Sequence, residues 1–152
     1  MGFMENITKK MMGASDKDNQ ESWGIIKSAA AKKGMQREGY ELAYGYYLQH
    51  GAFIKKFSHY AISFCPAKKE ILLVAMDVDG DACGTVIVLN ASTIQKAKKD
   101  MQGNWVITDS GLSQALSISV PPFIGSANAG TGVLPISQEK AATEFEALMK
   151  GF

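Results

Sequence analysis

Three aspartates that alternate around a glycine, in the stretch AMDVDGDACG, are the first candidates for chemistry in this chain. Asp77, Asp79 and Asp81 are spaced like the alternating ligands of a calcium-binding loop. Such a loop also requires glycine at its sixth position and glutamate at its twelfth, where this sequence has alanine and valine. Because Asp and Gly accommodate the backbone angles of tight connections, we interpret the stretch as a turn between strands and predict no metal site.

A glycine-rich stretch, GSANAGTG (residues 125–132), comes close to a phosphate-binding loop. Gly125 and Gly130 have the required spacing, but Thr131 stands where such a loop places the lysine that reaches the terminal phosphates. A phosphate loop also leads directly into a helix whose amide groups complete the site, whereas residues 133–135 intervene here. We therefore predict a surface connection and no nucleotide or other cofactor.

Cysteines and histidines are the remaining candidates for nucleophilic or acid–base chemistry. Cys65 and Cys83 form no CxxC motif, and we expect reduced thiols that face the core, as in a cytoplasmic protein. His59 and Cys65 are six residues apart in one predicted strand, a separation of about 20 Å that excludes a catalytic pair. No other spacing of ionisable residues points to catalysis, so we predict a non-catalytic protein.

Lysines gather in doublets, and four of them are the candidate ligand-binding residues: Lys55, Lys56, Lys68 and Lys69. Such doublets commonly keep strand ends solvated, and they can also contact anions or the headgroups of an anionic membrane. The net charge is only +1, and Arg37 is the single arginine among 16 basic residues. Because nucleic-acid recognition relies on basic surfaces and arginine forks, we predict no nucleic-acid partner.

The residues before position 40 have the patterns of helices. In residues 1–12 the apolar side chains fit a short amphipathic helix. A second helix is predicted for ESWGIIKSAAAKK, with Asp18 or Asn19 as its N-terminal cap and Gly34 as its stop. No stretch of about 18 apolar residues could span a bilayer, and no early apolar run fits a secretory signal.

From residue 40 onward the apolar residues alternate, which predicts strands. The alternation in YELAYGYYL, together with Gly45, favours a first strand over a helix, which the spacing of Leu42, Ala43, Tyr46 and Tyr47 would also fit. HYAISFC and EILLVAM flank PAKK, so we predict a hairpin whose second arm, apolar on both faces, lies inside a sheet. Further strands are predicted for GTVIVL, WVIT and LSQALSISV, whereas ASTIQKAKK fits either a helix or a strand.

The chain closes with a predicted helix that starts at about Ser137, its expected cap. Phe145, Leu148 and Phe152 fall on one stripe of this helix, and that stripe must be covered. About seven short antiparallel strands form two packed sheets or an incomplete barrel. We expect the helix to bury its stripe across an open end of that barrel.

This order of elements is similar to the pleckstrin-homology-like (PH-like) family, in particular its bacterial and GRAM-type members. The similarity covers residues 38–152 and is carried by HYAISFCPAKKEILLVAMD, TIQKAKKDMQGNWVITDSG, LSISV and EKAATEFEALM. It implies a mainly β fold, a seven-stranded antiparallel partly open barrel capped by a C-terminal helix. Residues 1–37 are then an N-terminal helical extension, and ASTIQKAKK is then a strand.

A PH-like domain without a catalytic constellation implies a binding module. The first hypothesis is a protein or peptide partner, bound by strand addition at a sheet edge. The second is weak binding to an anionic membrane surface. Many pleckstrin-homology domains bind phosphoinositides with alternating Lys and Arg in the first strand connection, where this chain offers Lys55 and Lys56 but no arginine. The third is a small enzyme that uses a pocket in the sheet.

Overall fold

The computed structural model describes residues 13–50, 55–127 and 132–152, and the side chains of all of these except His50, Lys55 and Lys56. The helix predicted for residues 1–12 lies outside the described residues. The described chain forms two helices and nine strands, in the order α2 (Asp16–Lys32), β1 (Glu41–His50), β2 (Lys55–Cys65), β3 (Glu70–Met76), β4 (Ala82–Asn90), β5 (Ile94–Lys99), β6 (Trp105–Asp109), β7 (Leu116–Ile118), β8 (Phe123–Ile124), β9 (Ile136–Ser137) and α3 (Glu139–Lys150).

Strands β1 to β4 form an antiparallel sheet in sequence order. The predicted hairpin is confirmed, because Cys65 of β2 pairs with Glu70 of β3 across the PAKK turn. The prediction for β3 is confirmed as well: it lies between β2 and β4, and most of its side chains are buried. β4 is the last strand of this sheet and, among the strands of the described ranges, pairs with β3 alone.

A second antiparallel sheet contains β5, β6 and β7, and a small third sheet contains β8 and β9. Of the segment ASTIQKAKK, residues 94–99 form the strand β5, as the resemblance implied, whereas residues 91–93 form the turn before it. A bridge between Tyr46 and Ser119 joins β1 to the residue that follows β7. The predicted seven-stranded barrel differs from the structure, which has nine strands in three sheets and no closed barrel among the described residues. β7 is also shorter than predicted, because residues 110–115 continue the turn that follows β6.

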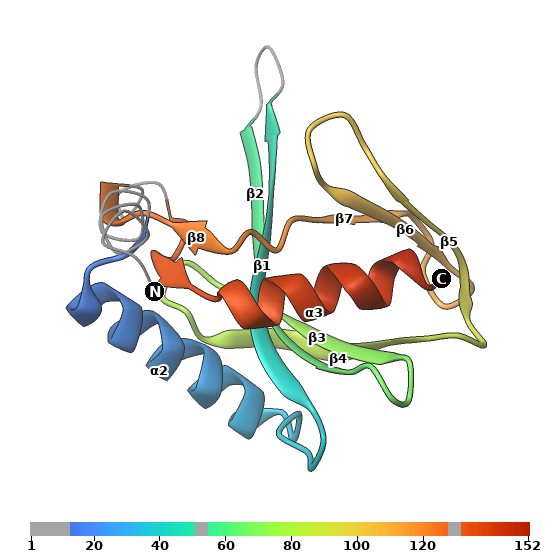
Figure 1. Cartoon of the computed structure of the whole chain (residues 1–152), viewed down its shortest axis with the longest axis horizontal. Helices are drawn as coiled ribbons and strands as arrows, with labels where there is room; N and C mark the ends of the chain where they lie inside the picture. Colours follow the sequence, from blue (N-terminus) through green and yellow to red (C-terminus); the bar gives the residue numbers. More distant parts are fainter. Residues whose placement is uncertain (1–12, 51–54, 128–131) are drawn as a thin grey trace, which may run out of the picture.

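α3 covers one face of the four-stranded sheet and lies between it and the second sheet (Figure 1). The predicted stripe is covered: Phe145 and Leu148 are buried, and Phe152 packs against the same core. The ring of Phe145 meets that of Phe64 edge-on at 5.6 Å between centroids. A full side chain of this size buried at the junction of three layers contributes several kcal/mol of stability.

The predicted cap of α3 is wrong. The helix begins at Glu139, after Gln138, and the side chain of Gln138 makes no capping hydrogen bond. Gln138 is instead buried, where its side-chain oxygen accepts from the amide of Tyr44 and its side-chain nitrogen donates to the carbonyl oxygens of Tyr44 and Pro121. Long-range contacts with β1 therefore fix the start of α3, and local capping rules do not include them.

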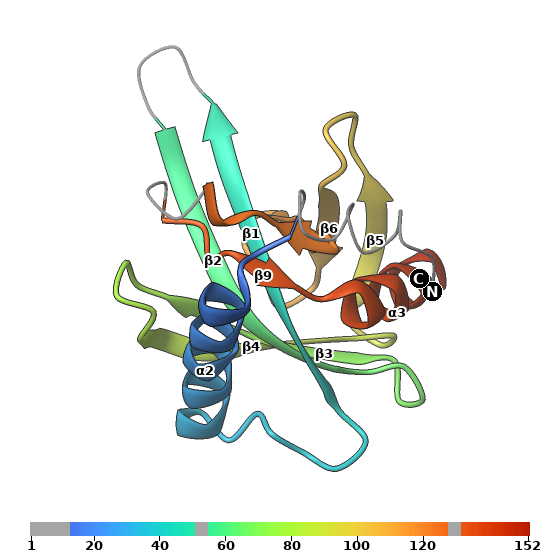
Figure 2. The same cartoon turned by 60° about the vertical axis from the view of Figure 1, so that its left-hand side comes forward.

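α2 packs on the opposite face of the four-stranded sheet (Figure 2). Because side chains alternate along a strand, Ala43 joins the α3 core and Tyr44 joins the α2 core. The predicted cap of α2 is wrong, since Ser15 accepts from the amide of Asp18 at 3.2 Å. The predicted stop is confirmed, because Gly34 has a φ of +66°, in the left-handed region.

None of the helices in the described ranges is long and apolar enough to cross a bilayer.

Candidate functional site

The four lysines predicted to bind a ligand lie in two pairs at opposite ends of β2. Lys55 and Lys56 begin this strand, whereas Lys68 and Lys69 lie in the turn after its last residue. Eleven residues of extended strand separate the pairs by about 35 Å, so the structure does not bring them together. The Lys68 ammonium group lies over the ring of Tyr40, 5.7 Å from its centroid, which gives this lysine a partner within the chain.

The aspartate stretch between β3 and β4 is a turn, as predicted. The side chain of Asp77 accepts from the amides of Asp79 and Asp81 at 2.9 and 3.0 Å. Gly80 has a φ of +83°, and a Cβ at this position would lie 2.5 Å from a side-chain carbon of Ile25 in α2. The carboxylate of Asp77 is therefore used to hold the turn closed against α2. Within the described ranges no three His, Cys, Asp or Glu side chains gather in a group that could hold a metal ion.

A buried polar chain joins β1, β2 and the turn after β3. The Tyr44 hydroxyl lies 2.8 Å from Nδ1 of His59, and Nε2 of His59 lies 2.8 Å from the carbonyl oxygen of Asp77. The same hydroxyl accepts from the amide of Leu134 at 3.2 Å. Because a carbonyl oxygen only accepts, Nε2 carries the proton that it donates to Asp77. In the neutral ring, which burial favours, Nδ1 accepts from the Tyr44 hydroxyl, and all of these groups are satisfied.

Burial controls the protonation of both side chains in this chain of hydrogen bonds. Removal from water lowers the pKa of His59 below its ordinary value and raises the pKa of Tyr44. Tyr44 is fully buried and His59 is 2% exposed. Since no substrate can reach either group, the pair stabilises the fold and is not positioned for acid–base chemistry. Sequence spacing missed it, although the β1–β2 register places Tyr46 opposite His59 and thus Tyr44 diagonally beside it.

The cysteines are both free, and they differ in exposure. Cys65 is buried, as predicted. Cys83 is exposed on β4, so the prediction that it faces the core is wrong. The reason is that β4 lies at the edge of its sheet and turns part of its length toward solvent.

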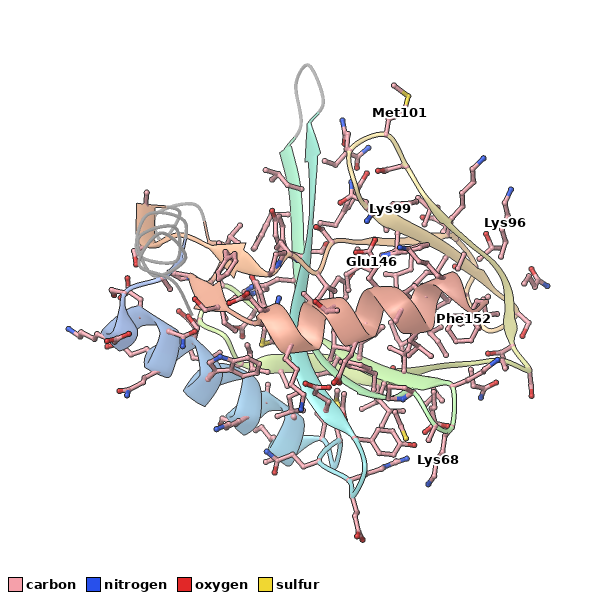
Figure 3. All side chains as sticks on the ribbon, viewed as in Figure 1. Lys68, Lys96, Lys99, Met101, Glu146 and Phe152 are labelled. Carbon is pink, nitrogen blue, oxygen red and sulfur yellow. The ribbon has the colours of Figure 1, made fainter. Side chains whose placement is uncertain are left out.

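The outward face of the β5–β6 hairpin is a basic, shallowly concave surface. Lys96 pairs across the hairpin with Thr108, and Lys98 pairs with Val106. These four residues line a shallow concavity of about 440 Å³, together with Lys99, Asp100 and Met101 at the end of the hairpin. No described acidic side chain forms an ion pair with Lys96 or Lys98, and Figure 3 shows Lys96 pointing away from the molecule. We call these four residues the β5–β6 basic face.

Lys99, one position further along β5, points the other way. Its ammonium group lies beside Glu146 of α3 (Figure 3) and donates to it. The same group lies over the ring of Trp105, 5.6 Å from the centroid. The hydrogen bond from Lys99 lowers the pKa of the Glu146 carboxyl group. Lys99 therefore anchors the hairpin on α3, while Lys96 and Lys98 remain available to a ligand.

The tip of the hairpin holds a rigid turn and one exposed apolar side chain. Asp100 accepts from the amides of Gln102 and Asn104 at 2.9 and 2.8 Å, and these hydrogen bonds lower the pKa of its carboxyl group. Met101 is fully exposed at this tip (Figure 3). The turn thus presents a thioether to solvent beside the β5–β6 basic face.

Comparisons of the chain with protein-family models, with curated proteins and with solved structures found no match. The basis for a function is therefore the geometry described above.

Proposed function

We propose that this chain is a non-catalytic, PH-like interaction module that binds an acidic, extended segment of a partner protein along β5. The arrangement of elements supports the PH-like assignment. A four-stranded meander is followed by a three-stranded one, and a C-terminal helix fills the space between the two sheets. The short strands β8 and β9 and the helix α2 are then additions to that plan.

The observation that carries the proposal is the open edge of β5. Among the described strands it pairs with β6 alone, so within this part of the chain the backbone groups on its other side are open to an added strand. Lys99 and Trp105 fix the end of the hairpin on α3, so the edge is held in place before a ligand arrives. A preformed edge lowers the ordering entropy that a peptide must lose on binding.

Charge selects the kind of segment that fits this edge. Lys96 and Lys98 repel a basic strand and attract glutamates or aspartates at alternate positions of an added strand. The charges are few, so affinity must come from main-chain hydrogen bonds together with this attraction. We therefore expect modest affinity that weakens as salt is raised.

The burial of the histidine supports a non-catalytic role. His59 is the single described histidine side chain, and it is inaccessible and saturated with hydrogen bonds. The exposed Cys83 has no described histidine beside it to activate the thiol.

A labelled peptide that alternates Glu with Thr is a suitable probe, because it combines strand propensity with the required charge. Fluorescence anisotropy should show saturable binding to the full chain. Replacement of Lys96 and Lys98 by Gln should weaken binding by about tenfold, on the order of 1.4 kcal/mol. A matched control, Lys32→Gln with Lys140→Gln, changes two exposed helical lysines and should leave binding unchanged.

An analogue of the peptide with N-methylated amides keeps the charges and loses the hydrogen-bond donors. Strand addition predicts that this analogue does not bind. Equal binding of both peptides, or equal weakening by both pairs of lysine substitutions, would show charge attraction without strand pairing and would contradict the proposal.

The exposed methionine favours a second candidate function, binding to an anionic membrane surface. Met101 beside Lys98 could enter the headgroup region while the lysines contact anionic lipids. Vesicles of phosphatidylcholine with phosphatidylserine should then sediment the chain at low salt. Met101→Asp should abolish this sedimentation and leave peptide binding intact. Absence of sedimentation at low salt would remove the membrane function.

A further inference from the structure

We propose that Glu146 is a built-in competitor of the ligand at β5: it occupies Lys99, a third basic residue of the site, and an acidic side chain of the bound segment displaces it. The inference rests on the proposed binding of an acidic strand at β5. The ammonium group of Lys99 donates to the Glu146 carboxylate, and this ion pair joins β5 to α3. Lys99 also lines the concavity that Lys96 and Lys98 line, so the ion pair borders the ligand surface.

Both partners of this ion pair are open to solvent. The side chain of Lys99 is 43% exposed, and that of Glu146 is 40% exposed. An exposed ion pair of this kind contributes little to stability, because water and salt screen it. A carboxylate of the ligand can therefore replace Glu146 at little cost to the fold. The ring of Trp105 lies 5.6 Å from the ammonium group and keeps Lys99 in place during the exchange.

Glu146 has space to move aside. Lys99 and Glu146 line a pocket of about 260 Å³ under the tip of the hairpin, between α3 and residues 119–122. The neighbouring Phe145 is buried in the core and fixes this part of the helix. A carboxylate displaced from Lys99 can thus turn to solvent by side-chain rotation alone, without movement of α3.

Strand geometry specifies where the displacing acid lies. Residues directly opposite each other on paired strands have their side chains on the same face of the sheet. A ligand residue opposite Lys98 therefore lies on the outward face, and the next residue, opposite Lys99, lies on the inward face towards α3. The preferred segment thus ends its alternating pattern with two consecutive acidic residues, whereas strict alternation leaves Lys99 bound to Glu146.

Two labelled peptides of equal charge test this inference. Each alternates Glu with Thr and carries one additional Glu, which forms an acidic doublet at the N-terminal end of one peptide and at the C-terminal end of the other. A strand that adds to β5 in a fixed direction brings only one of these doublets beside Lys98 and Lys99. Fluorescence anisotropy with the full chain at low salt measures both affinities.

Glu146→Gln removes the competing charge and keeps a side-chain oxygen that accepts from Lys99. It should tighten the binding of one doublet peptide by about threefold, the effect of one exposed ion pair, and leave the other peptide unchanged. Glu144→Gln is the matched control, because Glu144 lies on the same helix, faces Lys140 and has a side chain that is 39% exposed. This control should change neither affinity. In a Lys99→Gln background, Glu146→Gln should have no effect.

Three results would overturn the inference: unchanged binding of both peptides to Glu146→Gln, equal tightening of both, or tightening that persists without Lys99. Equal tightening would show a general effect of the lost negative charge. If the wild type binds the peptides and the Lys96→Gln, Lys98→Gln variant binds them more weakly, such a result removes this inference alone. If neither the wild type nor Glu146→Gln binds either peptide, the proposed function fails together with it.

Discussion

At the scale of single residues, hydrogen bonding explains the side chains that could have been mistaken for catalysts. Asp77 closes a turn, and His59 links Tyr44 to the backbone of that turn. Each polar atom in the contacts of His59 has a hydrogen-bond partner when the imidazole is neutral. Protonation of His59 therefore reduces stability, because it breaks a hydrogen bond in a place that water does not reach.

The burial of His59 predicts a pH dependence of stability. Its folded pKa is lowered from the ordinary value of 6.5. Below that value the unfolded chain binds a proton at this position that the folded chain does not, so the free energy of unfolding should decrease as pH falls below about 6.5. Above that value the contribution no longer changes with pH. Urea denaturation at a series of pH values from 7.5 to about 5 measures this decrease.

His59→Gln should flatten this response, because glutamine does not titrate. His50→Gln is the matched control and should keep the response of the wild type. If the decrease in the free energy of unfolding persists in His59→Gln and disappears in His50→Gln, then His50 is the group that titrates, which would contradict this prediction.

Residue-level rules predicted the turn at Asp77 and the stop at Gly34, because both depend on neighbours in the sequence. They failed at the two helix starts. Asn19, a predicted cap of α2, instead accepts from the amide of Ser137 at 2.8 Å. Ser137, the predicted cap of α3, is not the cap residue, because Gln138 occupies that position and the helix begins at Glu139. Asn19 thus has a partner more than a hundred positions away, and the side chain of Gln138 bonds to β1, and no local pattern encodes such partners.

At the scale of elements, one glycine allows β1 to lie against its neighbours. A Cβ on Gly45 would lie 2.5 Å from Cδ1 of Ile118 and 2.8 Å from Cδ1 of Ile62. This close approach allows the crossing of β1 and β7 that the bridge from Tyr46 to Ser119 completes.

Gly45→Ala should therefore destabilise the fold by about 1–3 kcal/mol, as expected for overpacking in a core. The additional change Ile118→Val removes the nearest atom and should recover part of that loss. Thermal and urea denaturation of the single and double variants form a mutant cycle. If the losses of unfolding free energy in the two single variants simply add in the double variant, the alanine methyl group does not clash with Ile118, and the prediction is wrong.

The longer strands were predictable because alternation repeats over many residues. The hairpin of β2 and β3 and the strand β6 were found in this way. The two-residue strands β8 and β9 have too few positions for any period to appear. The secondary structure of the β5 segment was ambiguous for a related reason. After Ile94, Ala97 is the one apolar residue of the strand, so the alternation of apolar and polar residues is too weak to distinguish a strand from a helix.

At the scale of the whole molecule, the four-stranded sheet is shared by two cores. Trp105 belongs to the core under α3, and Trp23 packs against the core under α2. Because β1, β2 and β3 contribute alternate residues to both, loss of one core should remove the support of the other. The sequence predicted that the apolar stripe of α3 is covered, but it did not predict two cores on opposite faces of one sheet. The reason is that the placement of the sheets and helices depends on contacts between distant segments and is not encoded in any single one.

Phe145→Ala should reduce the free energy of unfolding by about 3–5 kcal/mol, because it removes a buried ring at the junction of both sheets and α3. Phe152→Ala, at the half-buried end of the chain, is the milder control. The variant Trp23→Phe keeps the indole of Trp105, which reports on the core under α3. The variant Trp105→Phe keeps the indole of Trp23, which reports on the core under α2. Their fluorescence transitions should coincide with and without the Phe145 change. Separate transitions would contradict a single cooperative unit.

The central claim is that the free edge of β5 accepts an added strand from an acidic partner. Amide hydrogen exchange, followed by NMR on the full chain with and without a saturating peptide that alternates Glu with Thr, tests it most directly. We predict new protection at alternate amides of residues 94–99, with no change along β1 or β2. Protection confined to β4 or to the ends of β2, or no new protection in the presence of bound peptide, would contradict strand addition at β5.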